Sequence, residues 1–205
     1  DGSAPMDTSI SCIIQLALLT GQRRAEICGI EKTELDLNES DPVLTVSSGR
    51  AKNRQQHRVP LSPQAHTLLC NAVSDSGNSP FVFPSPYNHN HISPRSVTQA
   101  MERVRKNLEI RDVTVHDLRR TAGSFMSKFG VPRDVRERVL NHGGLRKGDM
   151  TDGTYNQYDY DAEKRAALEL WADALDCIVI GQSKKIEGFH PRLVRLNDSE
   201  DVEII

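Results

Sequence analysis

The stretch VTVHDLRRTAGSFMSKFG, residues 113–130, has the pattern of an amphipathic helix with a histidine and two arginines at its start. Its apolar residues recur at helical spacing over 117–129, and Gly130 stands where such a helix should stop. His116 and Arg119 are three residues apart, so both project from one face of the first turn, whereas Arg120 points elsewhere. The stretch therefore predicts a helix that presents a histidine and an arginine together near its N-terminal end.

Helical spacing also dominates the rest of the chain. Further helices are predicted over 9–20, 63–73, 94–108, 132–141 and 161–175. Pro63 and Pro132 lie near first turns, and Gly21 lies where a helix should end. Within 35–61, the β-type runs PVLTVSS and HRVPLS flank the polar connector GRAKNRQQ, which predicts a small hairpin. We therefore expect a mainly α fold with a small antiparallel β-sheet.

The composition is that of one globular domain: 205 residues, 37% hydrophobic and 26% charged. No apolar run reaches the length of a membrane span and no signal peptide is recognisable, so we expect a cytoplasmic protein without membrane contact. The four cysteines have neither zinc-site nor disulfide spacing, and the HNH run at 89–91 offers no third ligand. We expect no metal and no cofactor.

The net charge of −2 conceals an uneven distribution. Residues 196–205 carry four acids and no Lys or Arg, which leaves residues 1–195 with a net charge of +2. Residues 101–150 carry twelve Lys and Arg against seven acids, and residues 50–58 carry four cations and no acid. A basic region beside an acidic tail is common in nucleic-acid proteins, although solvated helix faces could produce the same imbalance.

Four other segments hold residues suited to chemistry. TGQRRAEI places Arg23 and Glu26 on one face at a helix start, and the hairpin connector carries Lys52. RVLNHGG ends a helix near His142, and TYNQYDYD places three tyrosines ahead of the last helix. Taken singly, each is better explained structurally, as an Arg–Glu pair, a solvated lysine, a helix-end histidine or packing tyrosines. Arg50 or Arg54 could also occupy the place of Lys52.

Taken in order, Arg, Lys, His-x-x-Arg, His and Tyr resemble the active-site series of the tyrosine recombinases, the phage-integrase family. LTGQRRAEI is similar to the family's first box, AKNRQQHRVPLS to its Lys-bearing hairpin, HDLRR to its His-x-Leu-Arg box and VLNH to its Leu-Gly-His box. The resemblance covers about 10–175, and the last segment is most similar to integrases of prophages and genomic islands. Asn141 stands where the family usually has Gly.

The resemblance implies a site for breaking a DNA phosphodiester without metal or ATP. Arg23 and Arg119 would bind the phosphate as paired guanidinium forks. His116 would hold or pass a proton, His142 would donate a hydrogen bond to the phosphate, and Lys52 would be the general acid for the departing 5′ oxygen.

Tyr155 aligns best with the family's nucleophile, which forms a 3′-phosphotyrosyl intermediate. The thirteen-residue gap from His142 is longer than the common family spacing, so Tyr158 is the second candidate and Tyr160 a distant third. Glu26 would orient its neighbours from behind the reacting groups.

These expectations set the domain organisation and partners. Residues 1–5 look like an expression scar, 6–180 form the catalytic domain with the tyrosine recombinase fold, and 181–205 form a tail that extends or packs on a neighbouring protomer. The abrupt start predicts that N-terminal DNA-binding domains of a longer protein are missing. The resemblance implies double-stranded DNA as partner and a homotetramer on it, with a monomer possible in solution. Alternatives are a noncatalytic DNA-binding regulator and a type IB topoisomerase-like enzyme.

Overall fold

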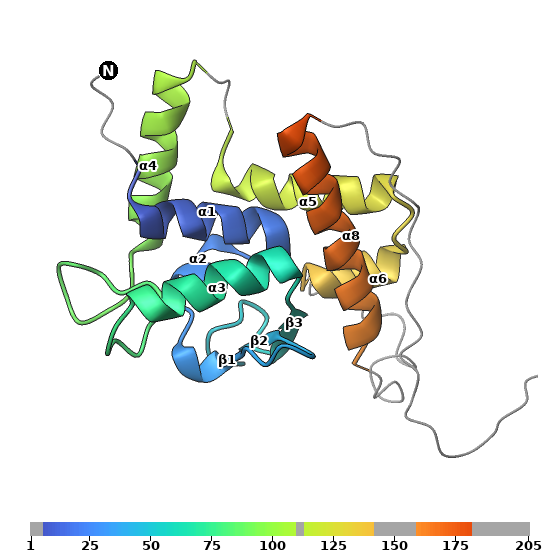
Figure 1. The fold of residues 1–205 in the computed structure, drawn as a ribbon, viewed down its shortest axis with the longest axis horizontal. Coiled ribbons are helices and arrows are strands. Elements are labelled where there is room, and N and C mark those ends of the chain that lie inside the picture. Colours follow the sequence, from blue (N-terminus) through green and yellow to red (C-terminus); the bar gives the residue numbers. More distant parts are fainter. Residues whose placement is uncertain (1–5, 110–112, 142–158, 182–205) are drawn as a thin grey trace, which may run out of the picture.

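The computed structural model describes residues 6–109, 113–141 and 159–181 (Figure 1). In chain order, its elements are α1 (Thr8–Thr20), α2 (Arg24–Cys28), the 3-10 helix η1 (Lys32–Glu34), β1 (Leu35–Asp36), β2 (Val43–Val46), β3 (His57–Pro60), α3 (Pro63–Asp75), α4 (Pro94–Asn107), α5 (Val115–Lys128), α6 (Arg133–Val139) and α8 (Asp161–Ile180). The prediction of a mainly helical domain with a small antiparallel sheet is confirmed. None of the helices in these ranges is long and apolar enough to cross a bilayer.

Local capping chemistry explains where the helices begin and end. α5 starts two residues before its predicted position because Thr114 and Asp117 cap each other: the Thr114 hydroxyl accepts from the Asp117 amide, and the Asp117 carboxylate accepts from the Thr114 amide. α1 ends at Gly21, whose φ of 64° is left-handed. α6 stops before the predicted 141 because Asn141 also adopts a left-handed φ, of 45°.

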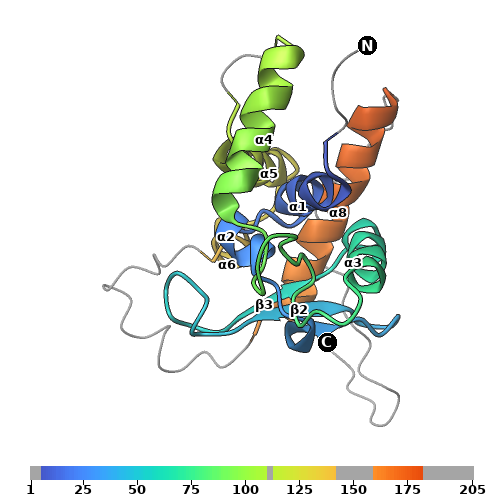
Figure 2. The same cartoon turned by 90° about the vertical axis from the view of Figure 1, so that its left-hand side faces the viewer.

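α1 forms the centre of the core. It packs against α2, α3, α4, α5 and α8, which surround it in Figure 2. Its residues Ile13, Leu16 and Ala17 are at most 1% exposed, as expected for a helix that is apolar on most of its surface. Trp171 of α8 lies against this helix, and its indole N–H donates to the Leu18 carbonyl at 2.8 Å. Helices α2, α3, α4, α5 and α8 are therefore arranged around one buried helix.

The sheet has three strands in the order β1-β2-β3, all antiparallel. The predicted hairpin is the β2–β3 pair, in which Val46 faces His57 and Leu44 faces Val59. β1 was not predicted, because two residues are too few to show an alternating pattern. α8 packs on β3, and its Lys164 donates to the Arg58 carbonyl at 3.0 Å. The hairpin base is thus held firmly, and the connector 47–56 extends from it.

His57, the first residue of β3, is a buried histidine at 7% exposure. Burial is the main cause that lowers its pKa to about 4, and the Lys164 charge is the next. The charges of Arg119 and Arg23 add to this effect, while a hydrogen bond with the Val139 backbone opposes it. His57 is therefore neutral in the folded protein at neutral pH.

The neutral state of His57 predicts a pH dependence of stability. The unfolded chain binds a proton at His57 near pH 6.5, but the folded chain does so only near pH 4. The stabilisation is complete above pH 6.5 and is lost as the pH falls to 4, by about 3 kcal/mol in unfolding free energy. Urea unfolding at several pH values in this range should show that the unfolding free energy of His57→Gln depends less steeply on pH than that of the original chain. The control is His89→Gln, at an exposed histidine, and equal slopes for all three proteins would contradict the prediction.

The left-handed turn at Gly21 gives a second stability prediction. A Cβ added there would lie 2.9 Å from Cδ2 of Leu140, whereas one added at Gly130, with φ of 82°, would meet nothing within 4 Å. Gly130→Ala should cost about 1 kcal/mol from backbone strain alone, and Gly21→Ala about 2 kcal/mol or more because a buried side chain must also move. Equilibrium urea unfolding measures both, and a smaller loss for Gly21→Ala would refute the role of the close contact.

Candidate active site

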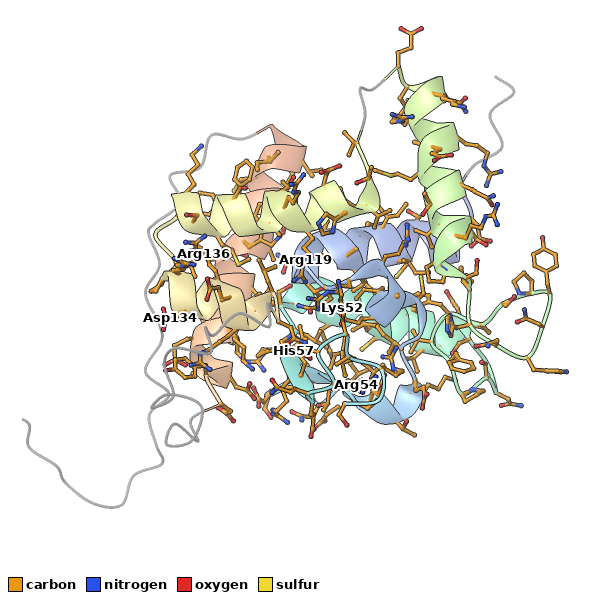
Figure 3. All side chains as sticks on the ribbon, turned by 180° about the vertical axis from the view of Figure 1, so that it is seen from behind. Lys52, Arg54, His57, Arg119, Asp134 and Arg136 are labelled. Carbon is orange, nitrogen blue, oxygen red and sulfur yellow. The ribbon has the colours of Figure 1, made fainter. Side chains whose placement is uncertain are left out.

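A pocket of about 600 Å³ opens between α2, α4, the start of α5 and the β2–β3 connector. Four of the predicted catalytic residues line it: Arg23, Lys52, His116 and Arg119. They come from segments almost 100 residues apart in sequence. Figure 3, which views the molecule from behind, shows Lys52 and Arg119 close together near the centre of the view. Folding therefore brings the first box, the hairpin and the His-x-Leu-Arg box of α5 to a single cavity.

Arg119 is the most deeply placed of these residues, at 3% exposure. Its guanidinium donates to the Gly21 carbonyl at 2.7 Å and to the Leu140 carbonyl. Burial lowers its pKa to about 10, and the neighbouring Arg23 charge acts in the same direction while Glu26 opposes it. The group stays charged at neutral pH, rigidly held and short of negative counter-charge.

Arg23 and Glu26 form the pair expected from the first box. Arg23 is the N-cap of α2, and its amide donates to Glu26 Oε2 at 3.1 Å while its guanidinium donates to Oε1 at 3.2 Å. Glu26 is 3% exposed, and Oε1 also accepts from the Lys52 amide at 3.4 Å. The buried carboxylate thus contacts both the first-box arginine and the hairpin backbone.

The cationic side chains of the β2–β3 connector point in different directions. Arg50 turns away from the pocket, where it pairs with Glu34 and donates to the Glu26 carbonyl at 3.2 Å. Arg54, which Figure 3 labels, is exposed and has a left-handed φ of 57°. Lys52 lines the pocket, whereas Arg50 and Arg54, the two arginines considered as alternatives, are not among its lining residues.

Three donors bind successive carbonyls at the end of α6. Gln22 donates to the Val139 carbonyl at 2.8 Å, Arg119 to that of Leu140, and Arg23 to that of Asn141 at 3.0 Å. The last carbonyls of a helix lack intrahelical partners and carry partial negative charge, so cationic donors suit them. The arginines thereby position the residue that directly precedes His142.

The pocket has a strong excess of positive charge. Its lining contains five Lys and Arg side chains and one carboxylate, that of Glu102. A second pocket, of about 650 Å³, shares His116 and Arg119 with the first and adds Arg120, Arg133 and Arg136 from α5 and α6. Glu137 is the one carboxylate in the lining of the second pocket, so both adjoining pockets have a net positive lining that suits a polyanionic ligand. Of these residues, Arg24 and Arg105 of the first pocket were missed by the sequence analysis, because their position facing the cavity depends on how α2 and α4 pack.

Several predicted residues cannot be placed in this site. His142, Tyr155 and Tyr158 lie outside the described residues. Tyr160 is described: it is the residue before α8, and its ring lies beneath the Arg138 guanidinium, 3.8 Å from ring centroid to Cζ. That contact joins the start of α8 to α6.

Comparison with known proteins places the chain in a family. The model of the phage integrase family matches residues 2–161. The prophage integrases IntZ and IntA of Escherichia coli K12 are 33% and 31% identical to it over 91% and 83% of the chain, which correspond to 43% and 40% of those proteins. The chain thus spans less than half the length of these curated relatives.

Solved structures show the same fold. The integrase of mycobacterium phage Brujita superposes with a TM-score of 0.62 over 82% of this chain and 53% of its own, at 20% identity. A lambda integrase dimer bound to a COC′ core site superposes with a TM-score of 0.54 over 67% and 51% of the two chains, at 19% identity. The ordered boxes, the meeting of three of them in one pocket and these matches lead to one conclusion: the chain belongs to the phage integrase family and has the fold of the tyrosine recombinase catalytic domains.

Proposed function

We propose that residues 6–180 form the catalytic domain of a site-specific DNA recombinase, which cuts and rejoins duplex DNA through a 3′-phosphotyrosyl intermediate. The observation that carries the proposal is the convergence of Arg23, Lys52, His116 and Arg119 on one basic pocket. Family membership supplies the reaction class, and the pocket supplies the groups that such a reaction needs.

The two arginines would bind the scissile phosphate. Attack on a phosphodiester builds negative charge on the nonbridging oxygens, and preorganised cations stabilise that charge without reorganising. The Arg119 guanidinium is held by two backbone carbonyls, and that of Arg23 by the Glu26 carboxylate and the Asn141 carbonyl. Both guanidiniums are therefore fixed before DNA binds. Each has five N–H donors, which leaves donors for a phosphate.

Tyr155 would be the nucleophile, with Tyr158 as the alternative. Its phenolic oxygen attacks phosphorus, the bond from phosphorus to O5′ breaks, and the tyrosine becomes joined to the 3′ phosphate. The phenol proton passes to a base, for which His116 at the pocket wall is suited. Lys52 donates a proton to the departing O5′, and His142 donates a hydrogen bond to the phosphate. The reverse sequence on another strand rejoins the DNA.

Duplex DNA is the proposed partner, and four protomers would assemble on it to exchange two pairs of strands. The arginines that line the second pocket on α5 and α6 support DNA as the partner, and the lambda integrase that shares the fold is a dimer bound to a COC′ core site. Since the proposed substrate is DNA, the cytoplasm is the proposed compartment. DNA affinity should depend steeply on salt, because cation–phosphate contacts release counterions.

The covalent intermediate can be tested without knowing the target site. Supercoiled plasmid at low salt with EDTA and no ATP should yield protein-linked DNA on a denaturing gel, and Tyr155→Phe should abolish the adduct. If the adduct is lost in Tyr158→Phe but not in Tyr155→Phe, the nucleophile is Tyr158. If no adduct forms, the noncatalytic DNA-binding alternative replaces the proposal.

The arginine assignment predicts a large effect from a change that keeps the charge. Arg23→Lys should slow adduct formation by about 100-fold or more, because lysine cannot make two parallel hydrogen bonds to phosphate or maintain the contact with Glu26. Arg95→Lys, at an exposed position on α4, is the matched control. Rates are compared at saturating protein, with thermal unfolding to verify the fold. Equal rates in the two variants would remove Arg23 from the phosphate site.

A further inference from the structure

Two asparagines 88 residues apart form a reciprocal amide pair beside the pocket. Asn53 Nδ2 donates to Asn141 Oδ1 at 2.6 Å, and Asn141 Nδ2 donates to Asn53 Oδ1 at 3.4 Å. Both side chains are half-buried. The contact joins the β2–β3 connector to the end of α6.

Asn141 occupies a backbone position that explains its residue type only in part. Its φ of 45° is left-handed, a conformation that Gly and Asn adopt more readily than other residues. Glycine, which the family usually has before this histidine, would satisfy the backbone alone. Asparagine adds an amide, and that amide is engaged with Asn53.

Asn53 follows Lys52, the proposed general acid. The first half of the connector is held by Arg50, and the Lys52 amide contacts Glu26 at 3.4 Å. Among the hydrogen bonds of the described chain, Asn53 provides the one side-chain link from residues 52–56 to the domain body. Lys52 therefore lies between two anchor points, its own amide and the side chain that follows.

We propose that the Asn53–Asn141 pair is a positioning device that holds Lys52 at the pocket, in line with the phosphate-binding arginines. The alignment follows from a shared residue, because the Asn141 carbonyl accepts from Arg23 while its side chain holds Asn53. Displacing a proton donor by about 1 Å can cost about 100-fold in rate, so a connector anchor affects catalysis without touching DNA. The inference rests on the proposed role of Lys52.

The test separates proton donation from the other steps. After the preferred cleavage site is mapped from plasmid adducts, a duplex is made with sulfur in place of the bridging O5′, because a thiolate leaves without a proton. Asn53→Ala and Asn141→Gly should each slow cleavage of ordinary DNA by about 10- to 100-fold, but cleavage of the sulfur duplex by less than about threefold. The double variant should cleave no more slowly than either single variant, because each single substitution already removes the Asn53–Asn141 contact.

The controls distinguish failure of this inference from failure of the proposed function. Lys52→Ala should show the same selective rescue by sulfur, and Gln56→Ala, exposed on the same connector, should match the original protein. Rescue of Lys52→Ala without rescue of the asparagine variants would overturn the positioning role alone. If sulfur fails to rescue Lys52→Ala, the general-acid assignment is wrong and the inference falls with it.

Amide hydrogen exchange reports on the anchor independently of catalysis. Exchange at residues 52–56 should accelerate to a similar extent in Asn53→Ala, Asn141→Gly and the double variant, because each frees the connector. Gln56→Ala should leave exchange at residues 52–54 unchanged. Unchanged exchange in the asparagine variants would show that the pair does not hold the connector, and would overturn the inference whatever the cleavage rates.

Discussion

The buried guanidinium of Arg119 joins the end of α1 to the end of α6. A charge at 3% exposure needs hydrogen-bond partners, and here the carbonyls of Gly21 and Leu140 accept from two of the guanidinium N–H groups. The left-handed turn at Gly21 lies between α1 and the Arg23 cap of α2, so the same junction positions the second arginine. The geometry of the pocket thus depends on one buried charge that two backbone carbonyls hold in place.

The two arginines of the site repel each other. Arg23 and Arg119 lie close enough for one to lower the pKa of the other, and Glu26 offsets that repulsion only in part. A phosphate would supply the missing negative charge. The α6 carbonyls hold the guanidiniums meanwhile without neutralising them, because a carbonyl carries only a partial charge.

Part of the geometry of this site could be predicted from sequence. The first-box pair of Arg23 and Glu26 and the shared cavity of His116 and Arg119 follow from three-residue spacing at helix starts, and both are present. The contacts of the connector could not be predicted, because polar residues without a helical or alternating pattern carry no signal of what they contact. Its anchor at Asn141 lies 88 residues away, beyond any local pattern.

The sequence by itself determined the helices, the hairpin and the order of the boxes, because periodicity, capping residues and turn residues act within a few positions of one another. Tertiary structure alone decided the burial of Arg119, the neutral state of His57, the strand β1 and the direction in which each connector cation points. These depend on partners far apart in the chain. Their energies come from burial and from hydrogen bonds that exist only once α1, α6 and the sheet have packed.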